Sequence, residues 1–182
     1  MYQKDTREQI MYDWHIKGVN CYEEDNHFEA FIYLWISLVV ACKIHLAFNK
    51  PYSKFVQRDL EDSKIIIDWA KNNSTRVVKI LTENDKSLAY LGTRYGSHFN
   101  NPIIDSSKRL QEKFLKLSRH FRGHDVYSNH DDLAVDFIEL INKIRNNLFH
   151  GNKSYEKKED QELLAAILPS LKDITSIAVE IY

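Results

Sequence analysis

Apolar residues recur at three- and four-residue intervals along much of the chain, the spacing that gathers them on one face of an α-helix. The clearest stripe precedes Gly151 and consists of Leu133, Phe137, Leu140, Ile141, Ile144 and Leu148. Asp131 or Asp132 is expected to cap the start of this helix, and Gly151 is expected to end it. No segment shows the clear alternation of a β-strand. The pattern therefore predicts an all-α fold.

The other helices are predicted from similar spacing and from their end signals. They span residues 23–48, 57–73, 74–84, 107–121 and about 159–181. Glu23, Glu24 and Asp25 suit the positive end of a helix dipole, and Pro169 is expected to kink the last helix. Residues 91–107 contain two glycines, a proline and several Asn and Ser residues, so they are predicted to form the main loop. The expected architecture is a helical bundle of about five to seven helices.

Composition agrees with a bundle and limits the number of domains. The chain has 182 residues, with 5 Gly and 3 Pro, whereas strand-rich folds use more of both in their turns. Hydrophobic residues make up 43% and charged residues 28%, which is typical of a globular protein. The length favours one domain over residues 1–182, large enough to bury a substantial core.

Several features predict a cytoplasmic protein with no membrane partner. The N-terminal segment is polar and lacks the apolar core of a signal peptide. The most apolar run, residues 30–42, is shorter than the about 20 residues that a bilayer requires, so it is predicted to be a buried core helix. Cys21 and Cys42 form no disulfide framework, which favours a reducing compartment. The net charge of −1 means that any nucleic-acid contact must come from a local basic patch.

The segment IRNNLFHGNK, residues 144–153, carries the candidate chemistry. At about 100° per residue, Asn146 and His150 lie opposite the apolar stripe, and Arg145 lies at its edge. Histidine suits acid and base roles near neutral pH, and arginine binds phosphate with two parallel hydrogen bonds. Asparagine can orient either of them. Arg145, Asn146 and His150 therefore suit catalysis of attack by an RNA 2′-hydroxyl on the neighbouring phosphate.

This chemistry predicts a homodimer. The transfer requires one base, one acid and one cation, but a single chain offers one histidine in this motif. Two copies related by a two-fold axis would supply two histidines and two arginines at one interface.

An ordinary helix end is the alternative interpretation of the motif. The helix dipole favours histidine near a C-terminus, and asparagine and glycine are common there. A second possible site, His120 and His124, has the spacing of a metal pair, but Gly123 breaks that helix and no third ligand lies at a convincing spacing. We therefore expect no metal and no other cofactor.

A local basic cluster surrounds the motif. Its members are Lys143, Arg145, Lys153, Lys157 and Lys158. The four lysines are candidate contacts for an RNA backbone, although charges on a helix end and loop often do no more than interact with solvent.

The motif residues resemble those of a known family. Arg145 to His150, spelled RNNLFH, matches the R-x4-6-H motif with a polar residue after the arginine, which marks HEPN domains (higher eukaryotes and prokaryotes nucleotide-binding). The context is also similar, because the motif ends an amphipathic helix in an all-α chain with one more helix after it. The stretch FIYLWISLVV, residues 31–40, resembles an early core helix of some of these proteins.

The resemblance implies a HEPN-like bundle and a function. Many HEPN proteins are metal-independent endoribonucleases that act as homodimers in toxin–antitoxin, antiphage and CRISPR-associated systems. By this resemblance, Arg145 would hold the phosphate, Asn146 would support it, and His150 would be the acid and base. An antitoxin or another defence-system protein is a further partner that the resemblance implies. Some members are binding or assembly modules without turnover, and that alternative stays open.

Overall fold

The computed structural model describes residues 6–49, 62–98, 108–149 and 158–180, and these form eight helices with no strand among them. The helices are α1 (Thr6–Glu23), α2 (His27–Asn49), α3 (Asp62–Asn72), α4 (Ser74–Glu83), α5 (Asp85–His98), α6 (Lys108–Phe121), α7 (His130–Phe149) and α8 (Lys158–Glu180). The predicted all-α class is confirmed, and the number of helices is one above the expected range.

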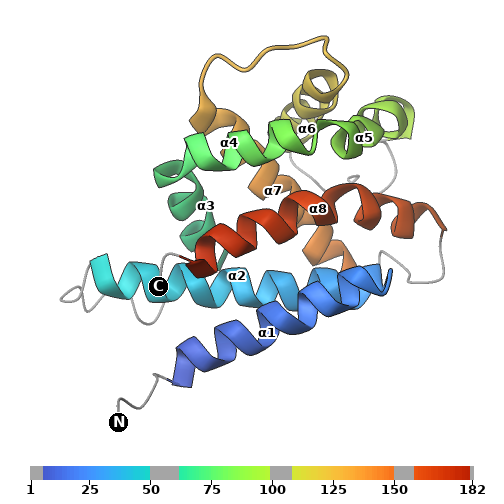
Figure 1. Cartoon of the computed structure of the whole chain (residues 1–182). Helices are drawn as coiled ribbons and strands as arrows, with labels where there is room; N and C mark the ends of the chain where they lie inside the picture. Colours follow the sequence, from blue (N-terminus) through green and yellow to red (C-terminus); the bar gives the residue numbers. More distant parts are fainter. Residues whose placement is uncertain (1–5, 50–61, 99–107, 150–157, 181–182) are drawn as a thin grey trace.

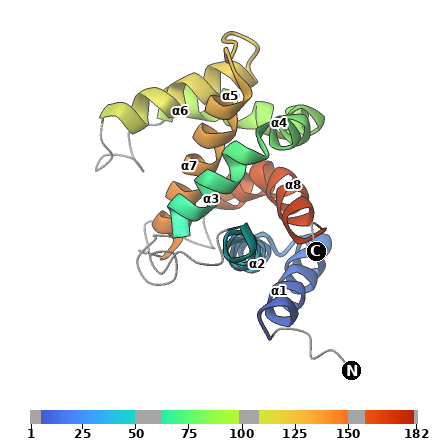
Figure 2. The ribbon, with the colours of Figure 1, turned by 90° about the vertical axis from the view of Figure 1, so that its left-hand side faces the viewer.

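The helices stack in three levels (Figures 1 and 2). At one end, α1 packs along α2. In the middle, α8 lies across α2 and also contacts α1, α4 and α5. At the other end lie α4, α5 and α6, while α7 runs between the levels and contacts α3, α4 and α6. This arrangement makes α2, α7 and α8 the central helices.

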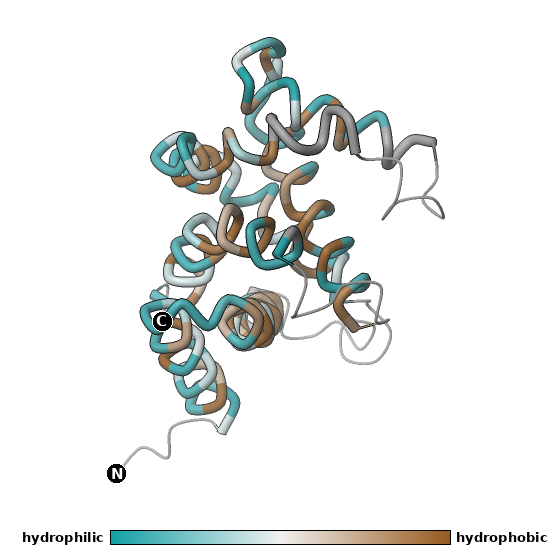
Figure 3. The backbone as a smooth tube through the Cα atoms, turned by 90° about the vertical axis from the view of Figure 1, so that its right-hand side faces the viewer, coloured by the Kyte–Doolittle hydropathy of each residue, from teal (hydrophilic) through white to brown (hydrophobic). Residues whose placement is uncertain are grey.

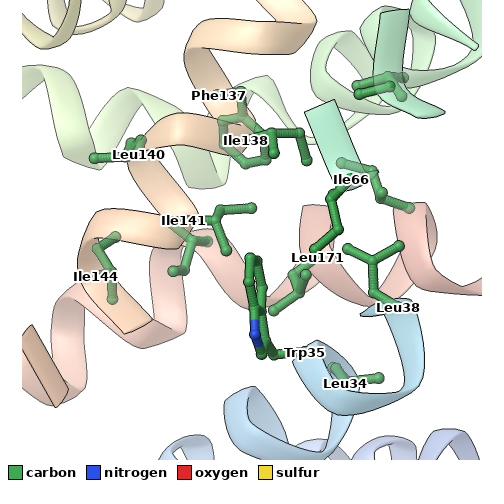
Figure 4. Packing of buried hydrophobic residues seen from close by; sticks show 14 of the residues in the cluster. Leu34, Trp35, Leu38, Ile66, Phe137, Ile138, Leu140, Ile141, Ile144 and Leu171 are labelled. Carbon is green, nitrogen blue, oxygen red and sulfur yellow. The ribbon is translucent and has the colours of Figure 1, made fainter. Parts of the chain in front are cut away.

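The buried side chains form one cluster to which all eight helices contribute. In α7 the apolar stripe is buried as predicted, from Leu133 to Leu148. Figure 4 shows Trp35 of α2 pointing toward α7, beside Ile141 and Leu171. Figure 3 shows hydrophobic residues along α7 and around α2, the helices that face one another across this core. Each such side chain contributes about 1.5–3 kcal/mol when it is fully buried, so the core fixes where α7 lies.

Three helix boundaries differ from the predictions. The acidic residues Glu23, Glu24 and Asp25 end α1 and form the turn to α2, because Asp25 adopts a left-handed backbone with φ 56°. Residues 91–98 belong to α5, and residues 99–107 of the predicted loop lie outside the described part. Asn129 caps α7, because its Oδ1 accepts a hydrogen bond of 2.8 Å from the backbone N–H of Asp132. Asp131 and Asp132 instead occupy the first turn of that helix.

The segment His27–Ala47 of α2 is the one helical stretch in the described part that is long and apolar enough to cross a membrane. More than half of that segment is buried inside the bundle. This burial is what the core helix of a soluble protein shows, and it agrees with the interpretation of residues 30–42 as a core helix.

The close approach of α1 to α2 depends on Gly18. A Cβ atom at this position would lie 2.7 Å from Cγ and 3.0 Å from the backbone nitrogen of Leu34. We expect Gly18→Ala to lower the free energy of unfolding by about 1–3 kcal/mol, because the buried side chain of Leu34 and the backbone of α2 would both have to shift. Chemical denaturation measures the change, and Asn20→Ala, on the exposed side of α1, is the control. A more stable Gly18→Ala protein would show that helix propensity outweighs the contact.

Candidate functional site

The last turn of α7 holds the arginine of the motif in a defined position. Nη1 of Arg145 donates a hydrogen bond of 2.9 Å to Oδ1 of Asn146. Cζ of Arg145 lies 4.8 Å from the centre of the Phe149 ring, a cation–π contact. Arg145 and Asn146 are half-buried, whereas Phe149 is 56% exposed. The guanidinium is thus held between an amide and a ring at the end of the helix.

The same guanidinium retains a donor that pairs with none of the described residues. An arginine side chain has five N–H donors in a planar arrangement. Nε of Arg145 is buried and has no hydrogen-bond partner among the described residues. A buried donor without a partner is unfavourable by about 1–3 kcal/mol, so an acceptor that reached this nitrogen, such as a phosphate oxygen, would be bound favourably.

Asn147 is a motif residue whose burial the sequence analysis missed. It is 5% exposed and engaged in the interior, while its neighbour Asn146 lies at the surface. The signal was present, because Asn147 follows Ile144 by three residues and Leu140 by seven, which places it beside the apolar stripe. Its role is therefore to fix the helix end within the bundle.

Three of the predicted site residues lie outside the described part of the chain: His150, Lys153 and Lys157. Of the other lysines, Lys143 is half-buried on α7. Lys158 is exposed at the start of α8, and its Nζ lies 3.7 Å from Oε1 of Glu162. The structure therefore brings Arg145 and Asn146 together, while Lys158 forms an exposed ion pair with Glu162, which at the surface contributes about 0–1 kcal/mol.

A polar network between α6 and α7 also escaped the sequence analysis. Nζ of Lys113 lies 3.0 Å from Oδ1 of Asp136 and 2.8 Å from Oε2 of Glu139. The hydroxyl of Tyr127 donates a hydrogen bond of 2.9 Å to the other oxygen of Asp136. Asp136 is 6% exposed, so this buried carboxylate pairs with a lysine that it shares with Glu139 and accepts a hydrogen bond from one hydroxyl. The network ties α6 to α7 about two turns before the motif.

This network shifts the pKa values of its members. Partial burial alone would lower the pKa of Lys113, but hydrogen bonds to Glu139 and Asp136 outweigh it and raise that pKa above its usual value. Burial, followed by the charge of Asp136, raises the pKa of the Tyr127 hydroxyl. Both shifts favour the protonated groups that hold Asp136 in place.

His120 and His124, near the end of α6, lie in ordinary structural positions. Nδ1 of His120 lies 2.9 Å from the carbonyl oxygen of Asp125. The centres of the His120 and Tyr127 rings lie 5.2 Å apart, and the two ring planes are nearly perpendicular. His124 is exposed beyond Gly123, whose φ of 76° ends the helix. Within the described ranges, no three His, Cys, Asp or Glu side chains converge to hold a metal ion.

A pocket of about 510 Å³ opens beside the last turn of α7. It lies between Leu148 of α7, the start of α2 and the first turns of α8. Three segments distant in the sequence form it, which is why periodicity along the chain gave no sign of it.

Comparison with known proteins found no match for this chain among family models, curated proteins or solved structures.

Proposed function

We propose that this protein is a metal-independent endoribonuclease of the HEPN type that acts as a cytoplasmic homodimer, as a toxin or an antiphage defence effector. The observation that carries the proposal is the guanidinium of Arg145, held by Asn146 and Phe149 at the end of α7. Asparagine follows arginine in the motif, and here its side chain orients the guanidinium directly. An oriented guanidinium whose Nε pairs with none of the described residues suits a phosphate group.

In the proposed reaction, His150 removes the proton from an RNA 2′-hydroxyl, and the oxygen attacks the adjacent phosphorus. The bond from phosphorus to the 5′-oxygen of the next nucleotide breaks, and that oxygen takes up a proton from the acid. Arg145 stabilises the negative charge that builds up on the phosphate oxygens. The products carry a 2′,3′-cyclic phosphate and a 5′-hydroxyl, so no water is consumed and no redox change occurs.

The homodimer follows from the need for an acid as well as a base. His150 of each copy would serve one of these roles. Phe149 is 56% exposed in the single chain. It supports the proposal because aromatic residues and arginines are enriched at the centres of protein interfaces, where they become buried on association.

The function is tested by cleavage of a mixed-sequence RNA by the purified protein with EDTA present. We expect cleavage to be unchanged by the chelator, because histidine and arginine can perform the transfer without a metal. Analysis of the product ends should find the cyclic phosphate and the 5′-hydroxyl. Cleavage that stops in EDTA and returns with Mg²⁺ would contradict this mechanism, and RNA binding without cleavage would instead support a binding module.

The dimer is tested by mixing subunits. If one site needs histidines from both copies, equal amounts of wild-type and His150→Ala subunits should give about one quarter of wild-type activity at the same total concentration, since about one dimer in four pairs two wild-type chains. Independent monomers would give one half. Light scattering at low micromolar concentration provides the parallel measurement, and a monomer that still cleaves RNA would contradict the shared site.

A further inference from the structure

The pocket beside α7 is lined by both polar and apolar side chains. Its lining includes Asp25, His27 and Phe28 at the α1–α2 turn, Leu148 of α7, and Asp160 and Gln161 of α8. A volume of about 510 Å³ falls within the range of small-molecule sites, about 300–1,000 Å³.

One side of the pocket is lined by the turn between α1 and α2. Asp25 has φ 56°, and the N–H of Asn26 donates a hydrogen bond of 2.8 Å to the carbonyl of Cys21, which closes α1 tightly. This turn leaves the side chain of Asp25 94% exposed, with Oδ1 3.8 Å from Nε2 of His27. A second carboxylate stands on α8, where Asp160 is 5% exposed. Asp160 is therefore fixed in position, whereas Asp25 is free to move.

The shape and charge of the pocket select among possible ligands. Among the described residues no three His, Cys, Asp or Glu side chains converge, so nothing in this lining favours a metal ion. The charged groups of the lining are two carboxylates, Asp25 and Asp160, and one histidine, His27, so they favour a phosphate less than a ligand that donates hydrogen bonds. The apolar walls of Phe28, Leu148 and Leu164 suit a flat ring, and the carboxylates suit a ring edge that carries hydrogen-bond donors.

Among the RNA bases, guanine has such an edge. Its N1–H and N2–H₂ groups are two adjacent donors that one carboxylate can accept together, and its O6 can accept from the amide of Gln161. In adenine and cytosine an acceptor nitrogen stands beside the amino group, and in uracil two carbonyls flank a single N–H. Each of these places an acceptor against the carboxylate. A carboxylate has about four lone-pair directions, so Asp160 can accept from a base while it keeps its contacts in the protein.

The pocket also lies next to the proposed phosphate site. Leu148 lines it, and Arg145 is one helical turn earlier, about 60° away around α7. The pocket and Arg145 therefore share the C-terminal end of α7. We propose that this pocket binds the guanine base of an RNA nucleotide next to the bond that is cleaved. The inference rests on the proposed ribonuclease function and adds its base preference.

The first experiment measures binding without cleavage. Guanosine, adenosine, cytidine and uridine monophosphates are titrated into the full-length protein, together with a 2′-deoxy tetranucleotide that contains one guanine and cannot be cleaved. We expect the guanine ligands to bind roughly 10- to 100-fold more tightly than the others. Equal binding of all four nucleotides would overturn the proposal. Arginine amide serves as a cationic probe, and tighter binding of this probe than of the guanine ligands would also overturn it.

The second experiment changes the carboxylate. Asp160→Asn replaces an acceptor by an amide of nearly the same shape, so we expect the guanine preference to fall roughly tenfold or more. Asp68→Asn, an exposed change on α3, is the matched control and should leave it unchanged. Gln161→Glu, at an exposed position, turns the O6 donor into an acceptor and should also weaken guanine binding, which keeps the test valid if Asp160→Asn does not fold. Two folded variants with the wild-type preference would overturn the proposal.

The third experiment distinguishes the source of the base and separates the two proposals. Cleavage sites in a mixed-sequence RNA should lie next to guanine, and guanosine monophosphate should inhibit cleavage by competition. Guanine binding that leaves cleavage unaffected would assign the pocket to a free nucleotide and overturn the RNA assignment. Cleavage without base preference would overturn the proposed guanine binding by the pocket but not the proposed ribonuclease function. Guanine-selective binding by a protein that cleaves no RNA would overturn the proposed ribonuclease function but not the guanine specificity of the pocket.

Discussion

Replacing His150 by alanine is expected to lower the rate of RNA cleavage by roughly 10²- to 10⁴-fold, the usual contribution of an acid or base group. The proposed transfer has no other group that can take the proton from the 2′-hydroxyl at neutral pH. By its spacing His150 lies opposite the apolar stripe, so the substitution should open no cavity in the core. The initial rate of cleavage and the thermal unfolding curve, taken on the same preparation, measure both effects.

The control for this prediction is His124→Ala, which removes an exposed histidine away from α7. It should keep both activity and stability. Wild-type cleavage should pass through a maximum between two pH values, because one histidine must be neutral and the other protonated. A folded His150→Ala protein that cleaves RNA at the wild-type rate would refute the assignment of His150.

Two substitutions of Arg145 are expected to lower the rate of cleavage to different extents. Arg145→Ala should be as inactive as His150→Ala, whereas Arg145→Lys should recover only part of the rate. Lysine keeps the charge, but it cannot present two parallel N–H groups to a phosphate or lie flat beside Phe149.

Replacing Lys113 by alanine is expected to lower the free energy of unfolding by about 3 kcal/mol, because it leaves Asp136 buried without a cation. This figure is at the lower limit for buried pairs, since the side chain of Lys113 is 22% exposed. Urea denaturation measures the change. The control is Lys43→Ala, whose partner Asp62 lies at 2.7 Å but in an exposed pair, and which should change stability by less than about 1 kcal/mol.

The pH dependence gives an independent check on this network. The pKa of Lys113 is raised in the folded protein, so its stabilisation is complete below the unfolded value of about 10.4 and is lost as the pH rises through the folded value. The difference in stability between wild type and Lys113→Ala should therefore be constant near neutral pH and shrink above about pH 10.4. A difference that is unchanged at alkaline pH would show that Lys113 stabilises by packing of its stem alone.

The sequence predicted the helices whose apolar pattern is strong and failed where tertiary contacts decide. The stripe of α7 and the apolar run in α2 were sufficient to place both in the core. Helix α1 was missed because its apolar residues follow no clear stripe, and its buried positions are Met11 and Gly18. Residues 91–98 were assigned to a loop because of Gly92 and Gly96, but contacts of α5 with α6 and α8 outweigh the low helix propensity of glycine.

The position of Arg145 on α7 could be predicted because it depends on helical spacing alone. The half-buried position of Arg145 at the edge of the stripe follows from counting residues along α7. The pocket could not be predicted in this way, because it brings Phe28, Leu148 and Asp160 together from three helices. The network at Lys113 likewise depends on how α6 meets α7, which no pattern within one helix encodes.

The burial of α7 along almost its whole length has a consequence for the speed of the proposed reaction. Because α3, α4 and α6 pack around this helix, the entropy of orienting Arg145 is lost when the chain folds and not when RNA binds. Among the described residues, Arg145 and Asn146 stay in place for as long as α7 stays packed. Loss of cleavage on warming should therefore coincide with unfolding of the bundle, and packing defects deep in α7 should slow the reaction without touching any group that meets the RNA.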